Sequence, residues 1–410
     1  MKIAFLTTEY VTEQDFDGGL SNYLYRICHV LKLRGHHVEI FTLSDHDEEF
    51  YHEDLLIHRV YNRTPIFEFL NRLSRYKLKR TFRFLSISYS LNKRLRQRQL
   101  LQQFDIVQAA SCFACGLFST FKRRIPVVTR ISSYEPLFRE FYQKPLNFDQ
   151  QVCERLELLA MERSDAVFTP SRFLSKVLLE NNNLLTDVIL SPFYLENELL
   201  DESIYRDQLW GKKYFLFFGA VGYLKGGEII ADALPLALNK IPDMHFIFVG
   251  KNLPGPNGKT MMDHIVLKAG EPTKRIMHFE PLTHQKLYPI IKNAVAVVLP
   301  SLVDNLPNAM IEAMGLGKVV IGTHGTSFEE LIDDGVSGIL IERNNPKALL
   351  DAMLKIWNMA VHERIAIGER AMEKTRELLP EIICGKMEAY FNAIITEKSG
   401  PPYRGLGKKG

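Results

Sequence analysis

The feature that most constrains the fold is an alternation of short apolar runs with helical segments, which occurs twice along the chain. In the first half, an apolar run at residues 2–8 precedes a segment of helical period at 20–34 and a second run at 38–43. The same alternation restarts at residues 214–218. Apolar runs separated by helices are typical of parallel sheets covered by helices. The sequence therefore predicts an α/β protein with two doubly wound domains that face a cleft.

The chain length of 410 residues also exceeds one ordinary hydrophobic core. We expect an N-terminal domain at residues 1–191, a linker without periodicity at 192–213, and a C-terminal domain at 214–382. A helix at about 383–398 follows and can pack back on the first domain. The tail at 399–410 is rich in Gly, Pro and Lys and is expected to be disordered.

Composition excludes several classes of protein. A hydrophobic content of 46% and a charged content of 24% are typical of globular chains, and a net charge of +3 is too small to indicate a nucleic-acid partner. The five cysteines fit a reducing compartment. No signal-type segment is present, and no apolar run approaches the roughly 18 residues that a membrane span requires. The expected location is cytoplasmic.

One segment, residues 72–98, departs from the even distribution of charge. It contains no Asp or Glu, and Leu and Phe are interleaved with its basic residues. This pattern fits one or two basic amphipathic helices on an anionic membrane surface, which would place the protein peripherally on the inner face of a membrane. It equally fits helices whose apolar faces pack on the domain while the charges are solvated. The basic residues are Arg72, Arg75, Lys77, Lys79, Arg80, Arg83, Lys93, Arg94, Arg96 and Arg98.

The strongest candidate site residues flank a strand-loop-helix corner. An apolar run at 294–299 leads into a polar loop that contains Asp304, and Glu312 lies almost two turns into the following helix. In an open parallel sheet, the carboxyl ends of the strands face the ligand crevice. Carboxylates there can bind sugar hydroxyls, aided by the backbone N–H groups of Asn305 and Leu306. The spacing alone equally fits a capped helix with one solvated glutamate.

Two glycine-rich loops are candidate phosphate-binding elements. The loop from Gly219 to Gly227 follows a strand and precedes a helix, so it can cradle a diphosphate, with Lys225 as a point charge on the leaving group. Gly18 and Gly19 stand at the start of the first helix. They would let backbone N–H groups approach an anion or sugar, or they form a tight turn and nothing more.

With these motifs in place, the chain resembles the family-4 retaining glycosyltransferases of GT-B architecture (glycosyl transferases group 1), which have two Rossmann-like domains. The resemblance covers nearly the whole chain. The run from Pro300 to Val320 is similar to the signature of that family, and its continuation matches at 325–332 and 334–340. Residues 217–226 resemble the phosphate loop of the family, and residues 9–19 and 33–38 resemble its N-terminal start.

The resemblance implies a hexosyltransferase that moves a hexose-type sugar, with retention, from a nucleotide-diphosphate sugar to a glycan, lipid-linked or small-molecule acceptor. Neither a metal nor another cofactor is expected. Glu312 would hold the ribose, and Asp304 would contact the hydroxyls of the donor sugar. Lys225 would neutralise the departing diphosphate, and the Gly18-Gly19 loop would close over it.

Three positions depart from the pattern of the family. Asp304 stands where the family has Glu, and Ala220 and Val221 stand where an Arg follows the phosphate-loop Gly. Arg130-Ile-Ser replaces the His that follows a strand in the first domain, and we hypothesise that Arg130 itself stabilises phosphate. Two alternatives stay open: a catalytically inactive GT-B-fold protein that binds sugar nucleotides, and a GT-B-fold nucleotide-sugar epimerase.

Overall fold

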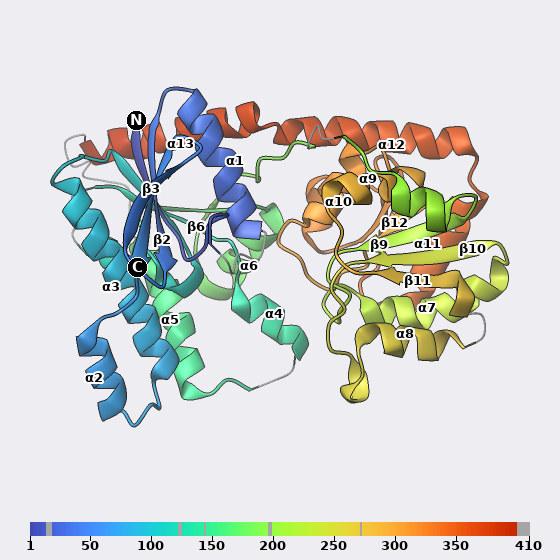
Figure 1. Ribbon diagram of the computed structural model, residues 1–410, viewed down its shortest axis with the longest axis horizontal. Helices are drawn as coiled ribbons and strands as arrows, with labels where there is room; N and C mark the ends of the chain where they lie inside the picture. The colour runs from blue at the N-terminus through green and yellow to red at the C-terminus, as the bar shows by residue number, and fades with distance from the viewer. Residues whose placement is uncertain (14–18, 122–124, 143–144, 196–198, 271–272, 400–410) are drawn as a thin grey trace. The chain divides into compact units, whose positions relative to one another are not determined.

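The chain divides into two compact units, which we describe separately (Figure 1). Unit 1 consists of Met1–Pro192 together with the segment that begins at Pro380, and unit 2 is Phe193–Leu379. Unit 2 is therefore inserted into the sequence of unit 1. The computed structural model describes residues 1–13, 19–121, 125–142, 145–195, 199–270 and 273–399. The predicted tail, from residue 400 on, lies outside these ranges.

Unit 1 is built on an eight-stranded sheet in the order β3-β4-β2-β1-β5-β6-β7-β8. All neighbouring strands are parallel except β3, which is antiparallel to β4. The direction in which strands are added reverses between β1 and β5, which makes this the switch point of the sheet. The strands are β1 (Lys2–Leu6), β2 (His37–Ser44), β3 (Glu48–His52), β4 (Leu55–Tyr61), β5 (Ile106–Ala110), β6 (Val127–Arg130), β7 (Ala166–Thr169) and β8 (Asp187–Val188).

Helices cover both faces of this sheet, because successive side chains of a strand point to opposite faces. Ile3 and Phe5 of β1 belong to the core beneath helices α1 and α13, whereas Ala4 and Leu6 belong to the core beneath α3 (Figure 1). The helices of unit 1 are α1 (Gly19–Leu33), α2 (Pro65–Leu73), α3 (Lys79–Gln99), α4 (Glu135–Tyr142), α5 (Phe148–Arg163), α6 (Arg172–Asn182) and α13 (Pro380–Ser399).

The C-terminal helix α13 is fastened to the rest of unit 1 by one carboxylate as well as by its apolar face. Glu388 accepts hydrogen bonds from Nε and Nη2 of Arg34, both at 2.7 Å, and lies 2.6 Å from Nε2 of His36. The hydrogen bonds from Arg34 lower the pKa of Glu388 to about 2, against the smaller opposing effect of burial, and His36 adds to the lowering.

Unit 2 has a six-stranded sheet in the order β11-β10-β9-β12-β13-β14, and every neighbouring pair is parallel. Its switch point lies between β9 and β12. Figure 1 shows α7 and α8 on one side of this sheet and α9 on the other. The elements are β9 (Lys213–Phe218), α7 (Gly227–Lys240), β10 (Met244–Val249), α8 (Met261–Ala269), β11 (Ile276–Phe279), α9 (His284–Asn293), β12 (Ala296–Val298), α10 (Asn308–Gly315), β13 (Val320–Thr323), β14 (Ile339–Ile341), α11 (Pro346–Asn358) and α12 (Val361–Thr375).

Most of the basic segment 72–98 belongs to α3, and its first two residues are the last two of α2. Helix α3 packs on the sheet, and the face in contact with it includes the buried side chains of Ile87, Leu91 and Leu95. Helix α2, by contrast, has no buried residue. In the part of the chain that the structure describes, no helix is long and apolar enough to cross a membrane.

Candidate active site

Two loops meet at the switch point of unit 2. One follows β9 and runs from Gly219 to Gly226, and the other follows β12 and precedes α10. Strands β9 and β12 are parallel neighbours, so both loops leave the same edge of the sheet. The backbone N–H of Leu302 donates to the carbonyl oxygen of Leu224 at 2.8 Å, which joins the loops directly. This contact connects the glycine-rich loop to the corner that contains the two candidate carboxylates.

Gly226 sets how closely these loops approach. Its φ of +84° lies in the left-handed region, and it caps the N-terminus of α7. A Cβ at this position would lie 2.1 Å from the carbonyl oxygen of Pro300. Both the backbone conformation and the available space therefore require glycine, and the close approach places the preceding residue, Lys225, against the second loop.

Lys225 and Asp304 form an ion pair between Nζ and Oδ2. The other carboxylate oxygen of Asp304, Oδ1, accepts from the backbone N–H of Asn305 at 3.0 Å, and the carbonyl oxygen of Asp304 accepts from Oγ of Ser327 at 2.8 Å. Both members of the pair keep some solvent exposure. A pair of this kind contributes about 1 kcal/mol or less to stability, so its main effect is to fix two side chains relative to each other.

Glu312 lies on α10, with its carboxylate almost buried. Side chains of a helix lean toward its N-terminus, so this carboxylate points back toward the loop that contains Asp304. Nε2 of His284 is 3.8 Å from Oε1 of Glu312, and the imidazole stacks on Tyr288 with ring centroids 5.2 Å apart. Asn305 and Leu306, both partly exposed, occupy the loop just before α10.

The remaining predicted positions of unit 2 differ in what surrounds them. Gly219 has a φ of +122°, and a Cβ there would meet nothing within 4 Å, so the backbone is open to an approaching group. Of the two residues that stand where the family has an arginine after this glycine, Ala220 is partly exposed, whereas Val221 is fully buried and bridges to Asn252.

Arg130 ends strand β6 in unit 1, and its side chain is buried. The guanidinium stacks over the ring of Tyr23 at 3.7 Å, Nη1 donates to Oγ of Ser132 at 2.8 Å, and Nη2 donates to Oγ of Ser191 at 3.0 Å. Burial lowers the pKa of Arg130. Among the described residues, no carboxylate lies within 4 Å of this cation. A buried cation without a counter-charge is costly, which keeps Arg130 a candidate for binding an anion.

Of the two glycines predicted to bind the donor at the start of α1, the structure describes only one. Gly18 lies outside the described residues, and Gly19 is the exposed first residue of α1. The structure therefore brings Gly219, Lys225, Asp304 and Glu312 together at one edge of unit 2, whereas Gly19 and Arg130 belong to unit 1.

Sequence reasoning did not single out two side chains that support the site, Ser327 and His284. Each follows the carboxyl end of a strand of unit 2, which is a usable signal. Ser327 lies within the family-like run at 325–332, as does Glu329, whose carboxylate accepts from the N–H of Gly325 at 2.9 Å and lies 3.0 Å from Nδ1 of His324. In the described ranges, no group of three or more His, Cys, Asp or Glu side chains could hold a metal ion.

Comparison with known proteins supplies the family context of this geometry. The model of the family described as glycosyl transferases group 1 matches residues 212–359, and that of glycosyltransferase family 4 matches residues 17–187. The O-antigen chain mannosyltransferase C of Escherichia coli is 24% identical over 396 residues, which cover 93% of this chain and 95% of the relative. The 2-deoxystreptamine N-acetyl-D-glucosaminyltransferase of Niallia circulans is 26% identical over 282 residues, 65% of this chain and 69% of the relative.

Solved structures show the same fold along nearly the whole chain. The sucrose-phosphate synthase of Thermosynechococcus elongatus matches with a TM-score of 0.73 at 16% identity, covering 96% of this chain and 98% of that structure. HepE of Anabaena in complex with UDP-glucose matches with a TM-score of 0.71 at 16% identity, covering 96% of this chain and all of the other.

Proposed function

This chain belongs to glycosyltransferase family 4, of the glycosyl transferases group 1, and from that premise we propose that it is a retaining hexosyltransferase. Its donor is a nucleotide-diphosphate sugar, and its acceptor is a glycan, a lipid-linked sugar or a small molecule. The observation that carries this proposal is the Lys225–Asp304 ion pair at the switch point of unit 2, where Asp304 lies in the loop that precedes the helix of Glu312. No metal or other cofactor is part of the proposal.

In the proposed mechanism, each side chain binds a different part of the donor. The carboxylate of Glu312 accepts hydrogen bonds from the two ribose hydroxyls, and the glycine-rich loop offers backbone N–H groups to the diphosphate. The ammonium of Lys225 neutralises the charge that develops on the diphosphate as the bond to the sugar breaks. The acceptor hydroxyl attacks on the face that the diphosphate leaves and gives its proton to the departing diphosphate oxygen, so the anomeric configuration is kept.

The ion pair gives Lys225 and Asp304 a defined position before the donor binds. A diphosphate carries more negative charge than one carboxylate, so it attracts the ammonium of Lys225 away from Asp304. Oδ2 of Asp304 then becomes available to accept a hydroxyl of the donor sugar. The shorter side chain of Asp304, relative to the usual Glu, suits this exchange because it already reaches Lys225 from its loop.

The acceptor and the location complete the proposal. One relative is named an O-antigen chain mannosyltransferase, and HepE was crystallised with UDP-glucose. A lipid-linked acceptor would bring the protein to a membrane surface, and the basic residues within 72–98 fit a peripheral position on its inner face.

The test is a panel of nucleotide-sugars incubated with the purified protein, with and without candidate acceptors, in which free nucleotide is measured. Lys225→Ala should reduce nucleotide release by roughly a hundredfold, since it removes the charge that stabilises the leaving group. Lys355→Ala, which removes an exposed lysine of α11 in the same unit, is the matched control and should act like the wild type.

The outcomes separate the three candidate functions. Release of nucleotide together with a glycoside of retained configuration supports the transferase. Nucleotide-sugar binding without release from any donor and acceptor mixture supports the inactive binding protein instead. Release of free, epimerised sugar supports the epimerase and would overturn the transferase assignment.

A further inference from the structure

Helix α2 and the turn after it form an exposed apolar surface on unit 1. The helix is fastened through Phe67, whose ring stacks on Phe82 of α3 with centroids 6.5 Å apart. Four other large apolar side chains on α2 and the turn are 60–70% exposed. We call these four the α2 surface: Ile66, Phe69, Leu73 and Tyr76.

Unpaired basic side chains surround the α2 surface. Arg72, Arg75, Lys77, Lys79 and Arg83 are all exposed, and within the described residues none of them forms an ion pair with a carboxylate. Further along α3, Arg94 pairs with Glu49 at 2.7 Å and Arg98 pairs with Glu39 at 2.8 Å, whereas Lys93 and Arg96 are exposed. Most of the exposed basic residues of the segment therefore lie close in sequence to the exposed apolar side chains.

The turn between α2 and α3 holds two of these residues in an unusual conformation. Arg75 has a φ of +53° and Tyr76 a φ of +61°, in the left-handed region that non-glycine residues rarely adopt. The N–H of Tyr76 donates to the carbonyl oxygen of Asn71 at 2.9 Å, which keeps the turn closed against the end of α2. The exposed positions of Arg75 and Tyr76 are thus set by the backbone.

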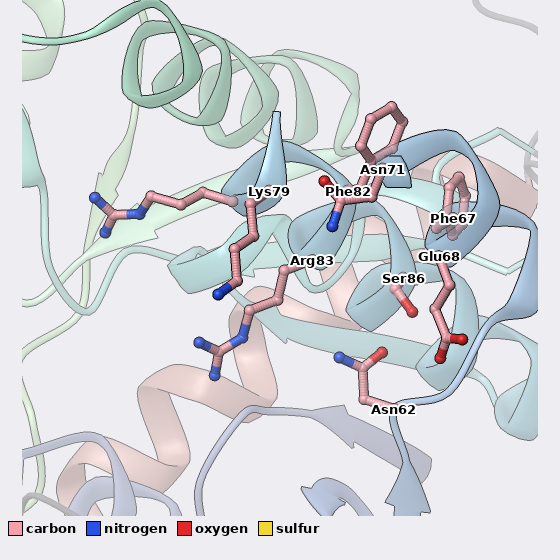
Figure 2. A pocket seen from close by; sticks show the side chains of 9 residues that line it. Asn62, Phe67, Glu68, Asn71, Lys79, Phe82, Arg83 and Ser86 are labelled. Carbon is pink, nitrogen blue, oxygen red and sulfur yellow. The ribbon is translucent and has the colours of Figure 1, made fainter. Parts of the chain in front are cut away.

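A pocket of about 400 Å³ lies between α2 and α3, next to the α2 surface (Figure 2). Lys79 and Arg83 are i and i+4 neighbours on α3, and in Figure 2 their charged ends point to the same side of the pocket. Asn62 and Ser86 add polar groups to the lining, and the carboxylate of Glu68, which also lines the pocket, lies 3.8 Å from Arg63. Arg80 and Asn71 also line the pocket, which therefore has three cations and three neutral polar side chains against one carboxylate, a balance that suits a phosphate.

We propose that the α2 surface inserts into the headgroup region of an anionic lipid bilayer, and that the pocket binds the phosphate of one anionic phospholipid headgroup through Lys79 and Arg83. The proposal rests on the peripheral membrane association proposed above, and the α2 surface is the part of the protein that would contact the membrane. Apolar side chains flanked by basic ones bind such membranes by burying apolar area and by attraction to anionic lipids. A protein partner that bound only the apolar side chains would not require five basic side chains around them.

The test measures binding to vesicles of phosphatidylcholine with and without phosphatidylglycerol by flotation. The wild type should bind the anionic vesicles and not the neutral ones. K79A/R83A should bind the anionic vesicles roughly twenty- to thirtyfold more weakly, since each basic residue near an anionic surface contributes about 1 kcal/mol. K93A/R96A is the matched control, because it removes the same charge from exposed positions further along α3.

A second variant tests the apolar contribution. Phe69→Ser replaces an exposed side chain, so it should fold normally and still lose several-fold in vesicle affinity. An equal loss of binding in K79A/R83A and K93A/R96A would overturn the headgroup site and leave only diffuse attraction. Absence of vesicle binding, with a dimer that Phe69→Ser dissociates, would assign the α2 surface to a second copy of this chain.

Two further measurements separate the lipid site from a soluble-phosphate site and from the transferase activity. The first measurement is the melting temperature in the presence of inorganic phosphate. If phosphate raises the melting temperature of the wild type but not of K79A/R83A, and the protein does not bind vesicles, the pocket binds a soluble phosphate and the lipid assignment is overturned. The vesicle assay uses neither donor nor acceptor, and Lys225→Ala should still float with the vesicles. Failure of the membrane proposal is therefore distinguishable from failure of the proposed transferase activity.

Discussion

Replacing Gly226 by alanine tests whether the contact between the two loops of unit 2 positions the active site. The new Cβ would lie 2.1 Å from the carbonyl oxygen of Pro300, whereas real Cβ contacts essentially never fall below 3.0 Å. One of the two loops must therefore move by about 1 Å, and the ion pair between Lys225 and Asp304 moves with it. A misplacement of this size can lower the rate of a positioned reaction roughly a hundredfold.

Gly211→Ala is the control, because Gly211 shares the left-handed conformation but not the crowding. Its φ is +77°, and a Cβ there would meet nothing within 4 Å. The left-handed backbone costs about 1–2 kcal/mol in both variants. The overlap with Pro300 should cost Gly226→Ala a further 1–3 kcal/mol or so, as overpacking does elsewhere.

The assay combines urea unfolding with nucleotide release from the donor identified by the panel. Gly226→Ala should unfold at a lower urea concentration than Gly211→Ala and release nucleotide about a hundredfold more slowly. Equal stability and equal turnover of the two variants would refute the reasoning. A less stable Gly226→Ala variant with normal turnover would show that the contact supports the fold without positioning the site.

Three further predictions address single side chains. Glu312→Ala should weaken nucleotide binding roughly a hundredfold by calorimetry, through the loss of two charge-assisted hydrogen bonds, and unchanged affinity would remove Glu312 from the ribose site. Glu388→Gln should lower the free energy of unfolding by about 1 kcal/mol at neutral pH after screening by solvent. Because the folded-state pKa of Glu388 lies below its usual 4.5, this stabilisation is complete above pH 4.5 and disappears as the pH falls toward 2, so denaturation curves of the two proteins should converge there. Arg130→Met should leave the melting temperature equal or higher, since it removes a buried cation that pairs with no carboxylate among the described residues, and it should slow nucleotide release. A large loss of stability with normal turnover would make Arg130 structural.

Most of the strands that sequence reasoning predicted are buried, because a buried strand is recognisable in the sequence as a run of apolar residues. Strand β9 is an example, since five of its six residues are buried. Strand β3 was missed because Glu48–His52 contains no such run. It pairs at the edge of the sheet, where Arg59 of β4 bonds to Glu48 at 2.5 Å. An edge strand of this kind is stabilised by its partner rather than by its own pattern.

For the site, the residue types were predictable but their pairing was not. Lys225 and Asp304 are both visible as motif residues, yet they are 79 positions apart in sequence. Their contact depends on β9 and β12 being neighbours and on the close approach at Gly226, which only the assembled sheet provides. The hydrogen bond from Ser327 to the backbone of Asp304 was unpredictable for the same reason, although Ser327 itself lies in the family-like run at 325–332.

The insertion of unit 2 into unit 1 has a consequence for synthesis on the ribosome. The core of unit 1 includes Ile383, Met387 and Phe391 of α13, which are translated only after all of unit 2. Unit 2 is contiguous, and its ends are joined by a hydrogen bond of 2.8 Å from the N–H of Phe193 to the carbonyl oxygen of Leu378. We therefore expect unit 2 to complete its fold before unit 1. Until α13 leaves the exit tunnel, the N-terminal half of unit 1 keeps an uncovered apolar face, to which chaperones can bind.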